Sequence, residues 1–520
     1  MNDVIFLRTS LQALVAAVLF TAMGPASADD TRDLYQVQCA SCHGEDRLGG
    51  IGPALLPGNL SRLKPEAAET VIRDGRPASQ MPAFGEQLDD GQIRSLAEWI
   101  YRAPEVEPTW GRDEILASHE VTHPDGSLPD EPRFDADPLN LFIVVETGDH
   151  HASLLDGDTF ERIHRFETRY ALHGGPKYTP DGRYVFFGSR DGWITKYDIY
   201  NMEVVAEVRA GINMRNIAVS GDGRYVMAAN YLPHSLVLFD AHNLDLMEVY
   251  PVMDKDGESS RVSAVYAAPP RSSFIAALKD IEEVWEIPWP LPTEPMVSTG
   301  HTTSPQRSHD TANFQVRRIP VPDYLDDFFF DLEYEHVIGA SRGGQGGMVV
   351  NLDSGEKVAD LPLEGMPHLG SGITWEYEGR RVMATPHLTK AAVSIIDMTD
   401  WTVVKTLETD GPGFFMRSHA NSPYVWVDVF FGPNRDRVHV IDKKSLAIVE
   451  TLIPEPGKTA AHVEFDRYGD KLLLSLWEED GAVIVYDGDT LEEEKRIPMS
   501  KPSGKYNVWN KTRYEEGTSH

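Results

Sequence analysis

Short apolar runs alternate with polar turn residues along most of the chain, and this alternation repeats with a long period. From residue 138 onward, an apolar run that ends in an acid is followed by a turn and another apolar run, at spacings of 42 to 45 residues between clear successive copies. Units of this length with about four short strands each are typical of β-propeller blades. The pattern therefore predicts an all-β, eight-bladed β-propeller over residues 138–520. Its repeats are marked by Asp156, Asp198, Asp240, Val284–Glu286, Asp353, Asp397, Asp442 and Asp487.

The preceding residues 29–103 show a helical period instead. Within 92–102 the apolar positions fall on one face of a helix, and 34–39 and 65–73 are two further candidate helices. Residues 81–84 lack such a period and are predicted to form a loop. The pattern predicts a small all-α domain in front of the propeller.

Three other segments differ from both predicted domains. Residues 1–28 combine a short apolar stretch with a final A-x-A sequence, which is typical of a cleaved Sec-type signal and of a periplasmic protein. An uncleaved anchor is the alternative, although the stretch is short for a membrane span. Residues 104–137 are rich in proline and acids, which predicts an extended linker. Residues 288–322 predict an insertion beside the fourth blade, with His301 and His309 exposed and without a role.

The charge of the chain is strongly acidic. The formal net charge is −33, from 81 acidic and 48 basic residues. Such a surface repels nucleic acid and anionic lipid, which argues against both as partners. It suits a basic electron-transfer partner, although solubility alone is the simpler explanation.

The only two cysteines lie in the sequence Cys39-Ala-Ser-Cys42-His43. CxxCH is the attachment site of a c-type haem, in which both thiols bond to the porphyrin and the histidine becomes an axial iron ligand. A zinc site would need further ligands at suitable spacing, and a thioredoxin-like pair would lie in a βαβ unit. Met81, in the predicted loop, is the candidate for the second axial ligand. With Gly52-Pro53 after the haem motif, the segment resembles a class I cytochrome c.

Four stretches of the propeller resemble the cytochrome cd1 family, in which a haem c domain precedes an eight-bladed propeller that holds haem d1. These stretches are 170–175, 365–372, 458–465 and 502–508. They are most similar to the dihydro-haem d1 dehydrogenase branch, a relative of the nitrite reductase branch. The resemblance implies one covalent haem c, and haem d1 or dihydro-haem d1 bound without a covalent bond as substrate and product.

The resemblance also implies roles for individual residues. His173 corresponds to the proximal ligand of the haem d1 iron, and His368 to a ligand on the opposite face. His462 corresponds to the catalytic histidine of the dehydrogenase branch, where a pKa near neutrality would suit proton transfer. Haem d1 carries several carboxylates, which planar guanidinium groups bind well. The candidates for contact with the macrocycle are Arg190, Arg215, Arg417, Lys505 and Tyr506.

One position departs from the nitrite reductase pattern. The resemblance places Phe330 where the reductases have the first of two distal histidines, whereas His368 matches the second. Loss of a proton donor is unsuited to nitrite reduction. It is compatible with the reaction that the resemblance implies, oxidation of a propionate side chain to an acrylate with electrons leaving through haem c to a periplasmic acceptor. The nitrite reductase that receives haem d1 is another expected partner. Three alternatives stay open: reduction of nitrite to nitric oxide, a haem d1 carrier without activity, and a binding propeller without haem d1.

Overall fold

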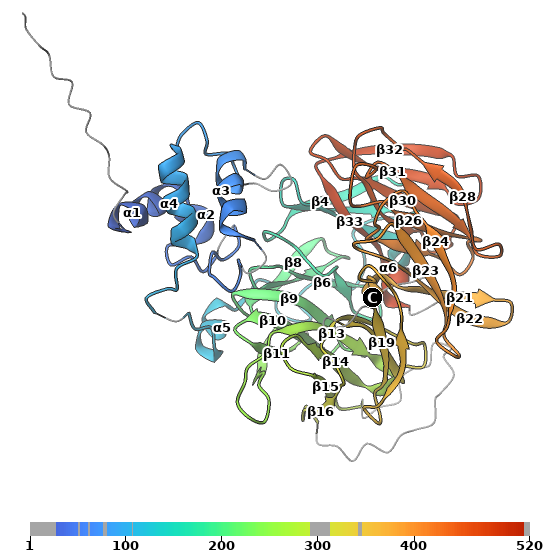
Figure 1. Ribbon diagram of the computed structural model, residues 1–520, viewed down its shortest axis with the longest axis horizontal. Helices are drawn as coiled ribbons and strands as arrows, with labels where there is room; N and C mark the ends of the chain where they lie inside the picture. The colour runs from blue at the N-terminus through green and yellow to red at the C-terminus, as the bar shows by residue number, and fades with distance from the viewer. Residues whose placement is uncertain are drawn as a thin grey trace, which may run out of the picture.

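A computed structural model describes residues 28–49, 52–60, 63–75, 81–106, 108–291, 313–341 and 346–513. The predicted export signal, apart from Ala28, lies outside these residues, as do His301 and His309. A small helical domain lies beside a larger ring of β-sheets (Figure 1).

The helical domain packs around one apolar core. Within the described residues its helices are α1 (Ala28–Gln38), α2 (Ala40–His43), α3 (Pro65–Asp74) and α4 (Asp90–Ile100). A capping box begins α4, because the Asp89 carboxylate accepts from the Gln92 backbone N–H while the Gln92 side chain accepts from that of Asp89. The apolar helix faces meet around the buried Tyr35, Ile93 and Leu96. The predicted all-α domain is confirmed.

The rest of the chain folds into antiparallel sheets arranged as the blades of a propeller. In the described part of the chain there are eight sheets. The first strands of neighbouring blades contact one another, which places them nearest the axis. In ring order, each from its inner strand outward, four blades are β33 (Pro502–Asn507), β2 (Leu141–Glu146), β3 (His151–Asp156), β4 (Arg162–Glu167); β5 (Lys177–Tyr178), β6 (Tyr184–Gly188), β7 (Trp193–Asp198), β8 (Glu203–Arg209); β9 (Asn213–Val219), β10 (Tyr225–Leu232), β11 (Ser235–Asp240), β12 (Leu246–Pro251); and β13 (Val262–Ala268), β14 (Ser273–Leu278), β15 (Glu283–Pro288), β16 (Arg317–Pro320). The other four are β17 (Leu325–Phe330), β18 (His336–Ser341), β19 (Gly347–Asn351), β20 (Lys357–Leu361); β21 (Ile373–Tyr377), β22 (Arg380–Pro386), β23 (Ala392–Asp397), β24 (Val403–Glu408); β25 (Met416–Ser418), β26 (Tyr424–Asp428), β27 (Val438–Asp442), β28 (Ala447–Leu452); and β29 (Ala460–Phe465), β30 (Lys471–Leu476), β31 (Gly481–Asp487), β32 (Glu493–Met499).

The periodic acids have a common structural place. Most of them end the third strand of a blade, as Asp198 ends β7, and Asp353 follows β19 by two residues. Their carboxylates accept from backbone N–H groups of the next turn; Asp442, for example, accepts from the N–H groups of Lys444 and Ser445. Such turns favour aspartate, which explains why the repeat is visible in the sequence. The predicted eight-bladed propeller is confirmed.

The last strand of the chain closes the ring. β33 pairs antiparallel with β2, with Lys505 opposite Val144, so the first blade contains strands from both ends of the propeller. In Figure 1 the red β33 and the blue-green β4 belong to the same blade, in which β2 and β3 lie between them. Closure leaves no open sheet edge at the seam between the first and last blades.

The segment predicted as an extended linker is partly folded. Residues 112–118 form α5 (Arg112–Ser118), and β1 (Glu120–Val121) pairs with β8 as a fifth strand of its blade. Ile115 of α5 is fully buried among apolar side chains of two blades. The prediction of a wholly extended linker is wrong, because the short amphipathic helix α5 buries enough apolar surface to hold this segment against the sheet.

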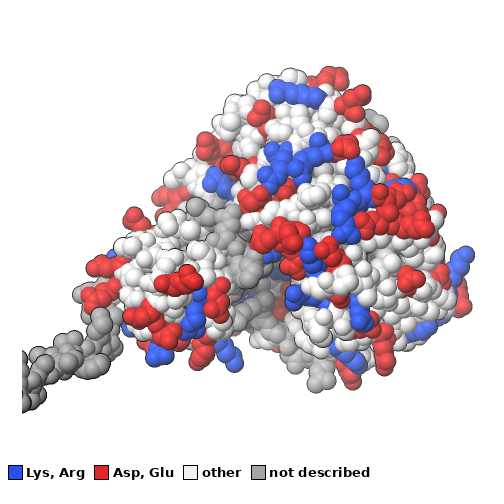
Figure 2. All heavy atoms as spheres, turned by 90° about the horizontal axis from the view of Figure 1, so that it is seen from above, with Lys and Arg blue, Asp and Glu red and all other residues white. Residues whose placement is uncertain are grey.

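The surface shows charges of both signs. Figure 2 shows acidic and basic side chains interspersed over the face in view, so the excess of acids does not form one separate patch on that face. Among the helices of the described residues, none has the length and apolar character needed to cross a membrane.

Candidate functional site

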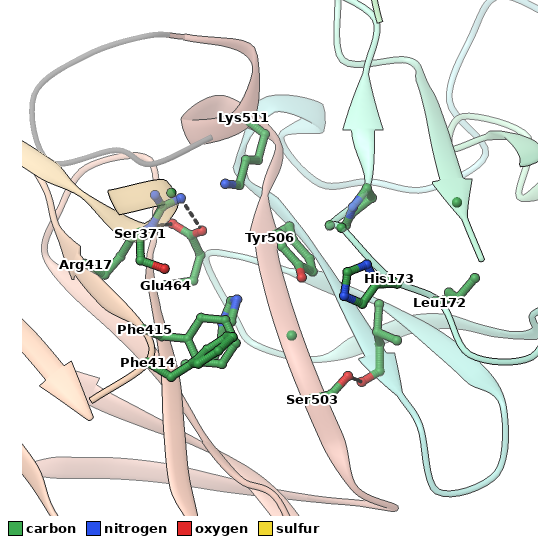
Figure 3. Close-up of a pocket in the computed structure, with 18 of the residues that line it drawn as sticks. Leu172, His173, Ser371, Phe414, Phe415, Arg417, Glu464, Ser503, Tyr506 and Lys511 are labelled. Atoms are coloured by element: carbon green, nitrogen blue, oxygen red, sulfur yellow. Dashed lines mark hydrogen bonds and ion pairs between the residues drawn. The ribbon is translucent and has the colours of Figure 1, made fainter. Parts of the chain in front are cut away.

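A cavity of about 320 Å³ lies where the inner strands of the propeller meet. Its walls come from loops and strands of blades all around the ring (Figure 3). The structure brings together at this cavity most of the residues that the resemblance implied, namely His173, Arg215, His368, Arg417, His462 and Tyr506. Two other candidates, Arg190 and Lys505, are not among the described residues that line it.

His173 precedes β5, and a hydrogen bond at each ring nitrogen fixes the orientation of its imidazole. Nδ1 lies 2.9 Å from the backbone carbonyl oxygen of Arg215, which can only accept, so Nδ1 carries the proton. Nε2 accepts from Nη2 of Arg190 over 2.9 Å. Burial, reinforced by the charges of Arg190 and Arg215, lowers the pKa of His173 well below its ordinary value. The ring is therefore neutral, and its Nε2 lone pair is the acceptor of the Arg190 hydrogen bond.

His368 shows the same arrangement on another blade. Its Nδ1 donates to the carbonyl oxygen of Phe414 over 2.7 Å, and its ring packs against that of Phe414. Nε2 lies 3.9 Å from Oδ2 of Asp327. Burial lowers the pKa of His368, although Asp327 opposes that shift.

Each of the two histidines has the hydrogen-bond arrangement expected of an iron ligand. His173 precedes β5 and His368 precedes β21, and these strands begin blades four places apart in a ring of eight. The two loops therefore face each other across the axis. In both rings a backbone carbonyl fixes Nδ1 as the donor, which is the usual second contact of an iron-ligating histidine and leaves Nε2 as the coordinating atom.

His462 lies in β29 with an unusual backbone. Its φ is 55°, at a register shift between Ala461 and Val463. The ring packs against Phe415 and Tyr506, and its Nδ1 accepts from the backbone N–H of Lys505 over 3.4 Å. Burial, with the charge of Lys505, lowers the pKa of His462 well below 6.5. The expectation of a pKa near neutrality is wrong, because burial disfavours the charged imidazolium and the charges of Lys505 and Arg417 disfavour it further.

The cations differ in how they are placed. Arg417 forms a bidentate ion pair with Glu464, both buried, so much of its charge is already compensated. Arg215 lies 3.8 Å from Asp327. Lys511, in α6 (Val508–Thr512), lines the cavity and was not predicted, since no motif marks it; Figure 3 shows it extending toward Arg417 and Glu464.

Lys505 faces away from the cavity. Its Nζ donates to Oγ of Ser475 over 2.7 Å, and burial lowers its pKa to about 7. Side chains alternate along a strand, and Gly504 and Tyr506 take the cavity side of β33. Because Tyr506 was predicted to line the cavity, this alternation could have shown from the sequence that its neighbour Lys505 faces the other way.

Phe330 does not lie at the cavity. It is buried in the core between two blades, in one cluster with Phe328. The acid three positions earlier, Asp327, lines the cavity instead and accepts from the Tyr266 hydroxyl over 3.0 Å. The expectation that Phe330 replaces a distal histidine is therefore wrong, since β17 turns that side chain into the sheet packing.

The helical domain fits a covalent haem c. Cys39 and Cys42 are free thiols at α2, and His43 Nδ1 donates to the Pro53 carbonyl oxygen over 2.8 Å, which leaves Nε2 for iron. A Cβ atom at Gly52 would lie 2.7 Å from the His43 ring, so only glycine fits there. Met81 is partly buried against the apolar core of the same domain.

Comparisons with known proteins agree with this architecture. The family described as "Cytochrome D1 heme domain" matches residues 136–511, and "Cytochrome C oxidase, cbb3-type, subunit III" matches residues 26–100. A dihydro-heme d1 dehydrogenase from Pseudomonas aeruginosa is 54% identical over 510 residues, covering 98% of this chain and 100% of that protein. A nitrite reductase from Stutzerimonas stutzeri is 24% identical and covers 97% of both chains.

A solved structure is similar over nearly the whole chain. "Dihydro-heme d1 dehydrogenase NirN in complex with DHE" superposes with a TM-score of 0.85 at 54% identity, covering 93% of this chain and 100% of that one. The two family matches together cover both domains of this chain. This chain belongs to the cytochrome d1 haem domain family.

Proposed function

We propose that this protein oxidises dihydro-haem d1 to haem d1 by dehydrogenating a propionate side chain to an acrylate. The observation that carries the proposal is the match at 54% identity, along the full length of a dihydro-heme d1 dehydrogenase. The nitrite reductase match is far weaker, at 24% identity. The cavity supports the same choice, since it pairs two candidate iron ligands with a buried neutral histidine.

The reaction converts a CH2–CH2 unit to CH=CH and releases two protons and two electrons. We assign to His462, which is neutral and packs against Tyr506, the role of taking a proton from the side chain. A covalent haem c would be held by Cys39, Cys42, His43 and Met81 and would supply one-electron redox chemistry, so the two electrons would leave one at a time to the external acceptor.

The substrate is held by its iron and its carboxylates. His173 and His368 are the proposed iron ligands. Arg215 and Lys511 line the cavity and would bind the substrate carboxylates, and Arg417 lines the same cavity while paired with Glu464. Arg190 donates to His173 Nε2, the proposed ligand atom, so binding of an iron at this atom would require Arg190 to give up that hydrogen bond.

The proposal also covers the location of the protein and its partners. The A-x-A sequence at residues 26–28 and the covalent haem motif support a periplasmic location. A periplasmic electron acceptor and the nitrite reductase that receives haem d1 are the proposed partners.

The test is a single-turnover assay. Purified holoprotein is loaded with dihydro-haem d1, an electron acceptor is added, and the extracted tetrapyrrole is measured by mass spectrometry. Loss of two hydrogen atoms that depends on the protein supports the proposal. An unchanged mass with tight binding would identify a carrier, and nitrite consumption by the loaded protein would identify a reductase. A chain that shows no absorption bands of bound haem d1 after loading would exclude all three.

A further inference from the structure

We propose that Asp428 is a positioning residue that fixes His368 and His462 relative to each other across the wall of the cavity. The inference deepens the proposed function and rests on it for the roles of the two histidines. The contacts on which the inference rests are all between residues of the protein, and none involves a bound group.

Asp428 ends β26 and is 2% exposed. Its Oδ1 accepts from the backbone N–H groups of Phe414, over 2.8 Å, and Phe415, over 3.0 Å. Its Oδ2 accepts from the backbone N–H of His462 over 3.3 Å. One carboxylate therefore joins the segment before β25 to the irregular centre of β29.

The contact with Phe414 reaches His368. The N–H of Phe414 is held by Asp428, while its carbonyl oxygen accepts from His368 Nδ1 over 2.7 Å. The two aromatic rings also pack together, with centroids 4.3 Å apart. A shift of the Phe414 backbone would therefore change both the orientation of His368 and the tautomer that exposes Nε2.

The contact with His462 acts on its backbone. His462 has a φ of 55°, a left-handed conformation that residues with a Cβ seldom adopt. The register shift between Ala461 and Val463 removes His462 from the ladder between β29 and β30. Asp428 supplies an acceptor for its N–H, and Phe415, held by the same carboxylate, packs against the imidazole with centroids 4.7 Å apart.

Burial of a carboxylate is costly unless hydrogen bonds compensate it. Burial raises the pKa of Asp428 to about 6, while the three backbone N–H groups lower it. All three of these donors belong to residues that line the cavity. The geometry thus connects this buried acid with the site rather than with a turn of its own blade.

The test compares Asp428→Asn with Asp466→Asn in the holoprotein. Asp466 is a matched control, since it is 3% exposed, its pKa is also raised by burial to about 6, and it accepts from the N–H groups of Asp470 and Lys471. Those bonds close the turn between β29 and β30. In Asp428→Asn the new amide keeps one acceptor oxygen and presents an NH2 group to an N–H that needs an acceptor.

We expect Asp428→Asn to lower kcat for dihydro-haem d1 by about tenfold or more, with a much smaller change in KM. Amide hydrogen exchange of the protein without substrate should become faster at Phe414, Phe415 and His462, and the absorption spectrum of bound dihydro-haem d1 should change. Asp466→Asn should leave kcat, these amides and the spectrum as in the wild type, even if its melting temperature falls.

Equal losses of kcat in both variants, or unchanged exchange at the three amides in Asp428→Asn, would overturn the proposal. If Asp428→Asn does not fold, Asp428→Glu keeps the charge and moves the oxygens by one methylene; a wild-type kcat in that variant would also overturn it. A wild-type protein without turnover would refute the proposed function alone, because the exchange and spectral measurements still test the role of Asp428.

Discussion

At the scale of single residues, burial determines which protonation states the site can use. His462 is 9% exposed, and burial together with Lys505 and Arg417 lowers its pKa well below 6.5. The folded protein therefore holds a neutral imidazole at a pH where an unfolded chain begins to bind a proton. A neutral imidazole can accept a proton, as the proposed reaction requires.

This difference makes stability depend on pH. Below pH 6.5 the unfolded chain binds a proton at His462 that the folded protein does not bind, so the free energy of unfolding falls as the pH falls. Between pH 6.5 and 5.5 we expect the wild type to lose about 1 kcal/mol more than His462→Gln. Urea unfolding of both proteins measures the difference, and parallel losses would show that His462 is not held neutral.

The same residue should control turnover. General acid–base catalysis typically contributes a factor of about 100 or more, so His462→Gln should lower kcat by at least that amount while dihydro-haem d1 still binds. His439→Gln is the matched control, because His439 is also buried but bonds to Thr451 and lies outside the cavity. Single-turnover kinetics and a binding titration separate the two effects. A similar loss in both variants would assign it to folding.

The site could be predicted in part from the sequence. His173 and His368 stand in distinctive loop motifs and His462 in a distinctive motif that forms β29, and each of the three reaches the cavity. The direction of a strand residue, by contrast, depends on register, which is why Lys505 was predicted at the cavity but lies behind it. Lys511 follows the last strand in a short helix without a motif, so only the closed ring brings it to the cavity.

At the scale of elements, α5 shows that a short amphipathic segment is hard to predict from the sequence when the residues around it have a loop-like composition. The blade repeat was predictable because aspartates recur at the same turn of each unit. α5, in contrast, spans seven residues within a stretch rich in proline and acids. Its first turn is stabilised by the Glu114 side chain, which accepts from the Gly111 N–H over 2.7 Å. The average composition of this stretch could not show that Ile115 packs into the apolar core between two blades.

The burial of this helix can be tested with two neighbouring residues. Ile115 is fully buried, whereas Leu116 is 48% exposed. We expect Ile115→Ala to destabilise the propeller by about 2–4 kcal/mol, since it removes methylenes and leaves a cavity, and Leu116→Ala to cost less than about 0.5 kcal/mol. Denaturant unfolding followed by tryptophan fluorescence measures both. Equal effects would mean that α5 does not pack on the blades as described.

At the scale of the whole molecule, Arg209 links the helical domain to the propeller cavity. Its Nη2 donates to the Leu48 carbonyl oxygen over 2.7 Å, and its Nε donates to that of Asp191 over 2.7 Å. The guanidinium also stacks on Trp110, 4.5 Å from the ring centroid. Asp191 follows Arg190, whose backbone N–H donates to the carbonyl oxygen of Ala171, two residues before His173, over 3.0 Å. A route of covalent and hydrogen bonds therefore runs from the segment after the CxxCH motif to the cavity.

Electron transfer slows steeply when two redox centres move apart, so this contact should matter for the rate between them. Arg209→Met removes both hydrogen bonds but keeps most of the apolar stem. We expect reduction of the covalent haem by bound dihydro-haem d1 to slow by about tenfold or more, with the haem potential unchanged. Stopped-flow absorption measures the rate. Arg261→Met is the control, because Arg261 pairs with Asp280 and is not part of this route. A wild-type rate in Arg209→Met would show that the domains stay coupled through the apolar contact of Ala54 and Leu56 with Ile212 alone.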